Sequence, residues 1–507
     1  MKTKQRNRSK KPLLTAVTIF CLLLGFILFF SAVWYRWYCG DIGFDSILFA
    51  MDAGGEGADL SAVKIYIVRA LLPALGCSAA AAVALLIQPK RGWNVKLRNR
   101  VVLLFPFRRI VAAITATVVA VGLIGAATVI SGLSKFLGGR LVTGSFYEEY
   151  YVNPDEVEII FPQQKQNLVY IVLESLENTF MSQQAGGALR HDLMPELVAL
   201  QQENVSFSHT DGLGGFYNTV GATWSVGSMV SITSGIHLQV GKGSTEGQRY
   251  EQFLPGATTI MDILHEQGYY QLYLTGCDAK YGGLQQYVSQ HGVDEVFDYY
   301  TAIQQGLIPE DYWQWWGYED KKLMEYAKAE LTRLSQQEQP FALYLATMDT
   351  HFTDGYFCED CENQFEEQYD NVITCFDKRM SEFMQWMAQQ PFMENTTVVL
   401  VGDHLTMDNL YAHRNIPTDY ERTAYNCIVN SAVQTDNTKN RQYTSFDLFP
   451  TMLAAMGCEI PGNRLGLGTN LFSQEQTLLE QFGSLEELND RLRQYSAYYV
   501  EHFGGIS

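Results

Sequence analysis

The sequence predicts a mixed α/β protein with three apolar N-terminal helices, followed by a domain built on a mostly parallel sheet. Two observations support this fold class. Long apolar segments occur only in the first quarter of the 507 residues, and the remainder alternates short apolar runs with amphipathic stretches. Such alternation is typical of a parallel sheet covered by helices on both faces. A chain of this length exceeds one compact core, so we expect more than one part.

The apolar segments run from Leu13 to Trp34, from Ile65 to Ile87 and from Ile110 to Leu133. Each is long enough to cross a bilayer. The first is longer than the apolar core of a signal peptide, and no convincing small-residue cleavage site follows it. We therefore predict a membrane anchor of three transmembrane helices.

The distribution of charge predicts the orientation of these helices. The first eleven residues and the segment 89–100 are rich in Lys and Arg, whereas the loop 38–61 carries five acidic residues and no basic ones. Because positive loops stay in the cytoplasm, everything after Lys135 is expected outside. The sequence thus predicts a multi-pass protein of the cell (cytoplasmic) membrane with an extracytoplasmic domain. The formal net charge of −19 argues against nucleic acid as a partner.

The expected domain boundaries follow from these patterns. We expect a membrane anchor over 1–133, a linker over 134–164, an α/β domain over 165–475 and a helical tail over 476–507. Three of the nine cysteines, Cys358, Cys361 and Cys375, share one polar segment of the α/β domain. One disulfide that includes Cys375 is predicted for an oxidising compartment, with its partner open. A zinc knuckle is the alternative, although no fourth ligand is apparent nearby.

The chain presents two ionisable residues where one predicted strand ends. The apolar run from Thr397 to Val401 reads as a buried strand, and Gly402, Asp403 and His404 follow it directly. In α/β sheets, ligands bind beyond the carboxyl ends of the strands. A carboxylate and an imidazole suit a divalent ion such as Mn²⁺ or Zn²⁺. A tight turn would explain the same residues, so a metal site needs partners from elsewhere in the chain.

Three other apolar runs also end in ionisable residues. They deliver Glu174, the pair Asp278 and Lys280, and the pair Asp349 and His351. Each residue alone could be a helix cap, a turn residue or a surface charge. Because parallel strands end at one edge of a sheet, the four runs together predict a single site there.

The order of these motifs resembles the membrane-bound phosphoglycerol transferases. These belong with the lipoteichoic acid synthases in the alkaline phosphatase and sulfatase superfamily, and the likeness is closest to bacterial enzymes that act on periplasmic glucans. The matching stretches are NLVYIVLES, the Gly/Ser/Thr-rich segment 212–238, ATMDTHFTDGY, VVLVGDHLTMDN, SFDLFPTMLAAMG, LGLGTNL and the acidic outer loop. The resemblance implies a transferase with phosphatidylglycerol as donor. It also implies an extracytoplasmic glycan or glycerophosphate polymer as acceptor, and a divalent metal: Mn²⁺ foremost, with Mg²⁺ or Zn²⁺ as alternatives.

The resemblance also implies roles for individual residues. Glu174, Asp403 and His404 match metal ligands of the family, and a hydroxyl from the Gly/Ser/Thr-rich segment completes the set. His351 matches a histidine that binds the substrate phosphate or assists the leaving group. Lys280 falls near a position where relatives place a basic residue toward the glycerophosphate. Asp278 and Asp349 are candidates for substrate binding beside them.

The nucleophile departs from the family pattern. Counting without a gap places Ala222 where the family has a nucleophilic threonine, and the nearest hydroxyls are Thr223 and Ser225. A Gly-rich loop can absorb a shift of one residue. A helix beginning near Trp224 would hold Thr223 at its N-terminus, where N–H groups attract phosphate. We therefore predict Thr223 as nucleophile and fourth metal ligand, with Ser225 as the alternative.

Other functions stay open at this stage. A sulfatase needs Cys/Ser-x-Pro-Ser-Arg around its nucleophile, and the segment 212–238 has neither Pro nor Arg. A phosphoethanolamine transferase is closer in chemistry. A catalytically silent, membrane-anchored binding protein would follow if Ala222 marks the loss of the nucleophile.

Overall fold

The chain separates into two compact units. The computed structural model describes residues 10–40, 43–52, 60–86, 93–97, 100–104, 109–240 and 251–504. Unit 1 comprises residues 1–44 and 57–137, and unit 2 comprises residues 45–56 and 138–507. Residues 45–56, which the sequence assigns to an outer loop of the anchor, therefore group with the C-terminal unit. Most of the expected linker and the whole expected tail also group with it.

Unit 1 contains the three predicted apolar helices. They are α1 (Lys10–Cys39), the continuous run of α3 (Leu60–Tyr66), the π-helical η1 (Ile67–Leu71) and α4 (Leu72–Leu86), and α5 (Arg109–Ile130). The segments Thr15–Cys39, Ala62–Leu86 and Ala112–Ile130 are long and apolar enough to cross a membrane. This confirms the prediction of three apolar helices. Strands β1 (Trp93–Leu97) and β2 (Arg100–Leu104) form a hairpin between the last two.

The π-helical turn in the second apolar helix has a local cause. Pro73 lacks an N–H, and its ring crowds the carbonyl of the residue four positions earlier, Arg69. The wider turn η1 ends two residues before Pro73 and relieves this crowding. The guanidinium of Arg69 lies 4.2 Å from the centroid of the Trp37 ring, so its charge rests on an aromatic face.

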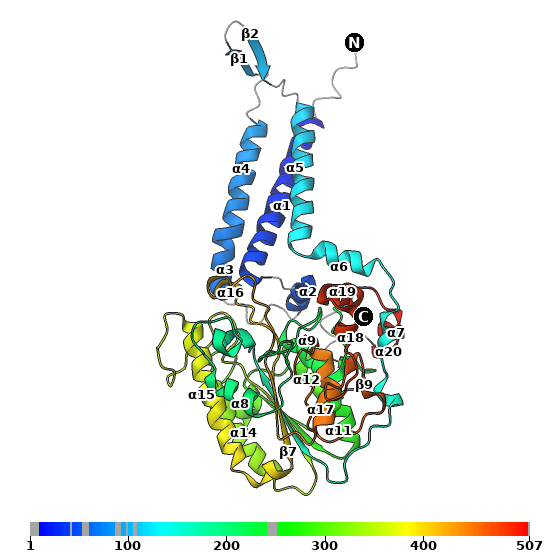
Figure 1. Cartoon of the computed structure of the whole chain (residues 1–507). Coiled ribbons are helices and arrows are strands. Elements are labelled where there is room, and N and C mark those ends of the chain that lie inside the picture. The colour runs from blue at the N-terminus through cyan, green and yellow to red at the C-terminus, as the bar shows by residue number, and fades with distance from the viewer. Residues whose placement is uncertain are drawn as a thin grey trace. The chain divides into compact units, whose positions relative to one another are not determined.

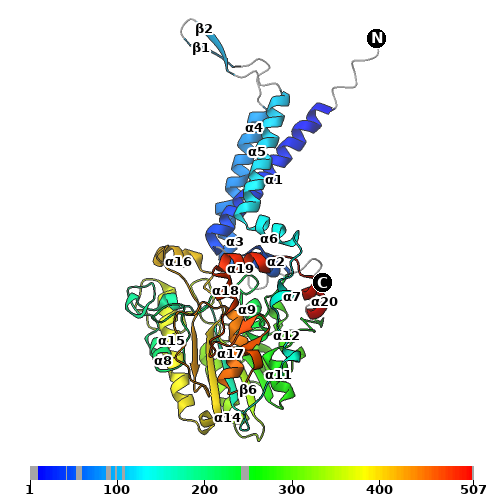
Figure 2. The same ribbon diagram turned by 45° about the vertical axis from the view of Figure 1, so that its right-hand side comes forward.

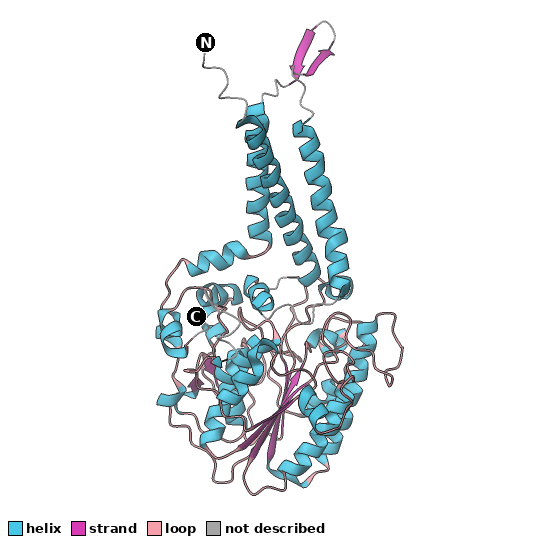
Figure 3. Cartoon of the chain, turned by 180° about the vertical axis from the view of Figure 1, so that it is seen from behind, coloured by secondary structure: helices cyan, strands magenta, loops and turns pink. Residues whose placement is uncertain are grey.

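Unit 2 is built on a central sheet (Figures 1 and 3). The sheet has six strands in the order β5-β4-β6-β3-β7-β8. All neighbouring strands are parallel except β7 and β8, which confirms the mostly parallel sheet. The strands are β3 (Asn167–Leu173), β4 (Tyr270–Thr275), β5 (Glu295–Phe297), β6 (Phe341–Ala346), β7 (Thr396–Gly402) and β8 (Asn426–Val429).

Helices cover both faces of this sheet (Figures 1 and 2). Alternate residues of β3 enter two separate cores: Leu168 and Tyr170 lie in one, and Val169 and Ile171 in the other. The first core includes α9 (Ser225–Ser234), α11 (Ile260–Glu266), α12 (Leu284–Gln290) and α17 (Leu448–Ala455). The second includes α8 (Pro195–Glu203), α14 (Asp320–Leu334) and α15 (Gln368–Ala388). Burial on both faces explains why the central strands read as continuous apolar runs.

The remaining elements are short, and the C-terminal ones pack into the first core. Leu488, Leu492, Tyr499 and Phe503 are all buried there. The short elements are α2 (Phe44–Asp52), α6 (Leu133–Arg140), α7 (Phe146–Tyr150), α13 (Tyr299–Gln304), α16 (Asn409–Asn415), α18 (Leu478–Phe482), α19 (Leu485–Leu492), α20 (Ala497–Phe503), β9 (Arg464–Leu465) and β10 (Gly468–Thr469).

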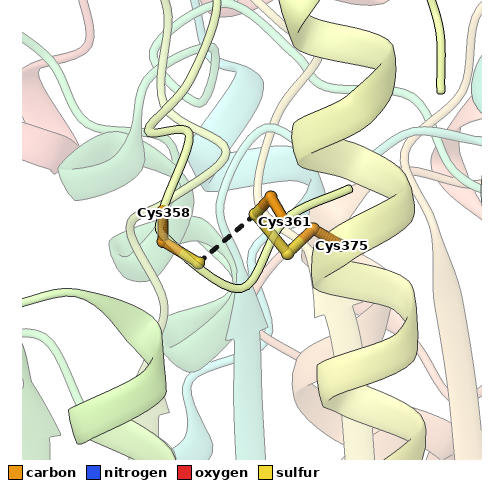
Figure 4. A group of neighbouring side chains, drawn as sticks. All are labelled: Cys358, Cys361 and Cys375. Atoms are coloured by element: carbon orange, nitrogen blue, oxygen red, sulfur yellow. Dashed lines mark hydrogen bonds between the residues drawn. A yellow bond between two sulfur atoms is a disulfide. The ribbon is translucent and has the colours of Figure 1, made fainter. Parts of the chain in front are cut away.

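The cysteine cluster holds one disulfide (Figure 4). Cys361 and Cys375 are bonded, which confirms a bridge that includes Cys375 and identifies its partner. The bridge ties the loop before α15 to that helix. The third sulfur, Cys358 Sγ, lies 3.3 Å from Cys361 Sγ and accepts a hydrogen bond from the Arg379 guanidinium at 2.9 Å. The positive charge of Arg379 next to Cys358 Sγ disfavours the binding of a metal cation at this sulfur. The disulfide therefore explains the cluster better than a zinc knuckle does.

Candidate active site

The register of the sheet brings three predicted ligands together. Leu173, at the end of β3, is paired with Gly402, at the end of β7. The residues that follow, Glu174 and Asp403, therefore leave adjacent parallel strands side by side. Ligand atoms of Glu174, Asp403 and His404 all lie within 4.8 Å of one another, and each residue is at most 2% exposed. These three residues are called the acidic triad below.

The His404 ring is held with one nitrogen directed at the carboxylates. Its Nδ1 lies 2.9 Å from the carbonyl oxygen of Leu405, which can only accept, so Nδ1 carries the proton in the neutral ring. The Nε2 lone pair then faces Asp403 Oδ2 at 3.4 Å and Glu174 Oε1 at 3.6 Å. Backbone bonding of one ring nitrogen is the usual way to present the other to a metal.

The two carboxylate oxygens of Asp403 differ in their hydrogen bonding. Its Oδ1 accepts hydrogen bonds from the N–H groups of Ser175 and His404, both at 2.8 Å. Its Oδ2 is buried and has no hydrogen-bond partner among the residues that the structure describes. Burial, with a further contribution from Glu174, raises the pKa of Asp403 to about 7. A buried carboxylate oxygen without a donor, beside a second acid and an imidazole lone pair, fits a divalent cation.

Ser225 supplies a hydroxyl to this triad. It is the first residue of α9, and its Oγ donates to Glu174 Oε2 at 3.0 Å and lies 3.3 Å from His404 Nε2. The first N–H groups of an α-helix have no partner within the helix. Because Ser225 stands at this end of a ten-residue helix, a phosphate next to its hydroxyl would also meet these groups.

Thr223, the nucleophile expected from the sequence, has a different neighbour. Its Oγ1 lies 3.3 Å from Ser46 Oγ, and the preceding Ala222 is fully buried. The helix begins at Ser225, whose hydroxyl bonds to Glu174 Oε2. The other oxygen of that carboxylate, Glu174 Oε1, accepts from the Ser175 hydroxyl at 2.7 Å.

Two polar residues that sequence reasoning missed, Asn218 and Ser228, bond to the backbone of Asp403. Asn218 donates through Nδ2 to the carbonyls of Asp403, at 2.7 Å, and Ala222, at 3.0 Å. Ser228 donates to the same Asp403 carbonyl at 2.6 Å. These bonds tie the segment that leads into α9 to the end of β7. No motif predicts the two bonds to Asp403, because they join residues far apart in the sequence.

His351 lies close enough to His404 for the two rings to interact electrostatically. Its Nδ1 is 2.6 Å from the Phe352 carbonyl oxygen, which leaves Nε2 with a lone pair in the neutral ring. Burial lowers the pKa of His351 to about 4; the bond to Phe352 opposes this, and His404 adds to it. The Trp316 ring packs against it at a centroid distance of 4.6 Å. The ring is therefore neutral near pH 7, with an Nε2 lone pair that can accept a hydrogen bond.

The other predicted substrate residues are placed differently. Asp349 is buried with both oxygens engaged: Oδ1 accepts from the Asp320 N–H at 3.0 Å, and Oδ2 pairs with Arg379 at 2.9 Å. Lys280 is exposed, and its backbone N–H bonds to Asp278 Oδ1 at 2.9 Å. The structure thus gathers Glu174, Ser225, Asp403 and His404, whereas the Asp349 carboxylate braces the loop that carries His351.

A buried ion pair supports the loop after His404. Glu177 is fully buried, and its Oε1 accepts from the Thr406 N–H at 3.1 Å. Arg422 donates through Nε to Glu177 Oε2 at 2.8 Å and through an Nη to the Thr406 carbonyl at 3.2 Å. Both partners therefore hold the backbone two residues beyond a triad member.

Arg422→Ala is expected to lower the free energy of unfolding of unit 2 by about 3–5 kcal/mol, because it leaves the buried Glu177 carboxylate without its positively charged partner. Denaturant titration of the full chain in detergent measures this. Arg414→Ala is the matched control: its pair with Glu367 is 49% and 32% exposed, so a loss of about 0–1 kcal/mol is expected. Equal losses for the two variants would contradict the role given to Glu177.

Residues 166–458 match the model of the Sulfatase family, and the chain belongs to this family. Phosphoglycerol transferase I of Escherichia coli O127:H6 (strain E2348/69 / EPEC) is 26% identical over 459 residues, covering 89% of this chain and 55% of that protein. Phosphoglycerol transferase I of Xanthomonas euvesicatoria pv. vesicatoria (strain 85-10) is 33% identical over 262 residues, covering 49% of this chain and 35% of that protein. The chain thus spans about half, or less, of the length of these curated relatives.

The fold is similar to a solved membrane protein. The integral membrane protein lipooligosaccharide phosphoethanolamine transferase A (EptA) from Neisseria meningitidis superposes with a TM-score of 0.51 at 15% sequence identity. The match covers 88% of this chain and 84% of that chain. At this identity the likeness concerns the fold alone. The resemblance to phosphoglycerol transferases stated from the motifs is confirmed by the curated relatives.

Proposed function

We propose that the protein is a metal-dependent transferase that moves phosphoglycerol from phosphatidylglycerol to a glycan or glycerophosphate polymer outside the cytoplasm. The observation that carries this proposal is the Ser225 hydroxyl, hydrogen-bonded to the acidic triad at the N-terminus of α9. This arrangement combines a nucleophile, a ligand set for a cation and N–H groups for a phosphate. The names of the curated relatives support phosphoglycerol as the group transferred.

The acidic triad and Ser225 are assigned to the metal, with Mn²⁺ foremost and Mg²⁺ or Zn²⁺ as alternatives. When bound, a divalent ion lowers the pKa of a neighbouring hydroxyl and offsets negative charge on a phosphoryl group. In this assignment Ser225 takes the role that the sequence gives to Thr223.

In this proposal the transfer takes place in two displacement steps. In the first, Ser225 Oγ attacks the phosphorus of phosphatidylglycerol, a new O–P bond forms and the bond to diacylglycerol breaks. The proton from Ser225 ends on the diacylglycerol oxygen. In the second, an acceptor hydroxyl attacks the same phosphorus and Ser225 leaves, regaining a proton. His351 Nε2 is assigned to accept the proton of the acceptor hydroxyl, because the ring is neutral and Nδ1 is already bonded to Phe352.

The purified full chain in lipid nanodiscs with Mn²⁺ tests this proposal. With phosphatidylglycerol and a glucan oligosaccharide, we expect release of diacylglycerol and phosphoglycerol on the sugar. Release of diacylglycerol from phosphatidylethanolamine alone would indicate a phosphoethanolamine transferase. Hydrolysis of an aryl sulfate alone would indicate a sulfatase, and no turnover of any of the three would favour a silent binding protein.

Placement of unit 2 outside the cytoplasm belongs to the same proposal and has its own test. A reporter enzyme that is active only outside should work when fused after Lys135. A cytoplasm-dependent reporter should work when inserted within residues 89–100, because that segment is rich in Lys and Arg. If both insertions report the same side, the donor in the outer leaflet would be out of reach, and this orientation would be wrong.

A further inference from the structure

The short helix α2 contacts the loop that leads to Ser225. In sequence it lies between the first two apolar helices, yet residues 45–56 group with unit 2. Asp45, Ser46 and Phe49 are all buried. Each of the three makes a contact with residues 221–226 or with the turn after β4.

Two contacts are polar. Asp45 Oδ2 accepts a hydrogen bond from the Gly221 N–H at 3.1 Å, and Ser46 Oγ lies 3.3 Å from Thr223 Oγ1. Gly221 has φ +77, and a Cβ there would lie 2.5 Å from the Leu238 carbonyl oxygen, so only glycine fits this turn. Gly221 lies outside any helix or strand, so the Asp45 carboxylate supplies a hydrogen-bond acceptor for its N–H that regular secondary structure does not.

The third contact is apolar. Phe49 is 3% exposed, and its ring lies 5.3 Å from the ring of Trp224, the residue that precedes the nucleophile. The same ring reaches Gly282, where an added Cβ would meet Phe49 Cζ at 2.8 Å. Phe49 therefore fills the space between the start of α9 and the turn that follows Lys280.

We propose that α2 is a positioning element of the active site. Asp45, Ser46 and Phe49 hold the Gly221–Trp224 loop, and through it they fix the start of α9 and the direction of the Ser225 hydroxyl. The inference rests on the proposed function in one respect, that Ser225 is the nucleophile. If the attacking oxygen is misplaced by about 1 Å, the chemical step can slow on the order of 10²-fold. A contact with the loop can therefore control the rate without touching substrate.

Asp45→Ala in the full chain in nanodiscs tests this inference. We expect the single-turnover rate of phosphoryl transfer to Ser225 to fall about 10- to 100-fold, with KM for phosphatidylglycerol within about twofold of the parent value. Bound metal should stay close to that of the parent, because the ligands are untouched. Asp45→Asn keeps an oxygen for the Gly221 N–H and should recover most of the rate. Ala50→Ser, an exposed position on the same helix, is the matched control.

The outcomes separate this inference from the proposed function. An unchanged rate in Asp45→Ala, or a loss matched by an equal loss of bound metal, would overturn the positioning role. If the parent chain does not use phosphatidylglycerol, the donor assignment fails on its own. The rates of the parent and of Asp45→Ala are then compared with bis(p-nitrophenyl) phosphate as substrate. The same fall of about 10- to 100-fold is expected.

Discussion

Ser225→Ala is expected to reduce phosphoglycerol transfer on the order of 10⁴-fold or more. It removes the hydroxyl that contacts both Glu174 Oε2 and His404 Nε2 at the start of α9. The side chain is small, so the fold and the Tm should change little. Diacylglycerol release from phosphatidylglycerol by the full chain measures the loss.

Thr223→Ala is the matched control for this substitution. Thr223 is two residues away and also carries a hydroxyl, but its contact is Ser46, so we expect a loss of at most about tenfold. A larger loss in Thr223→Ala than in Ser225→Ala would return the nucleophile to the position expected from the sequence. Activity close to that of the parent in the double variant would contradict a covalent mechanism.

Removal of the metal is expected to abolish transfer, and Mn²⁺ should restore it. His404→Ala removes one ligand and should weaken metal binding at least about 100-fold, measured as bound metal by mass spectrometry after dialysis. This readout does not depend on activity. The loss follows from the geometry, since His404 Nε2 lies within 3.6 Å of both carboxylates.

His413→Ala is the control for the metal experiment. His413 is an exposed histidine of α16, nine residues beyond His404, and its removal should leave metal content unchanged. Equal effects of the two substitutions would mean that the metal is held elsewhere. Full activity after complete chelation would contradict the metal requirement itself.

The edge of the sheet was predictable because strand ends carry their own chemical signal. Apolar runs that stop at Glu174 and at Asp403 and His404 can be read from the sequence, and parallel strands end at one edge. The adjacency of β3 and β7 could not be read in this way, because strand order depends on contacts between distant segments. The strand-end pattern therefore predicts which residues reach the edge, whereas the grouping of Glu174 with Asp403 and His404 came from the resemblance to the phosphoglycerol transferases.

The choice between Thr223 and Ser225 depended on where one helix begins. Both hydroxyls precede or open the same helix, and helix boundaries are the least certain part of any sequence-based prediction. In the structure α9 begins at Ser225, and Trp224 is extended. The two hydroxyls flank Trp224, and they have different partners: Ser225 Oγ bonds to Glu174, whereas Thr223 Oγ1 lies next to Ser46 Oγ.

Asp349 and α2 show a second limit. Asp349 follows a strand, as the triad carboxylates do, but Asp320 and Arg379 engage both of its oxygens. Residues 45–56 read as an outer loop between two apolar helices, and their hydrophobic pattern does not reveal that Phe49 packs on Trp224. Both outcomes depend on partners more than 25 residues away, which local periodicity does not encode.

Peptide mass spectrometry of the full chain tests the central claim most directly. The protein is incubated with phosphatidylglycerol and Mn²⁺ without an acceptor, quenched in acid and digested. The account predicts a glycerophosphoryl group on Ser225 that disappears when a glucan oligosaccharide is added before the quench. A glycerophosphoryl group on Thr223, or transfer to the glucan with no modified residue at any time, would contradict it.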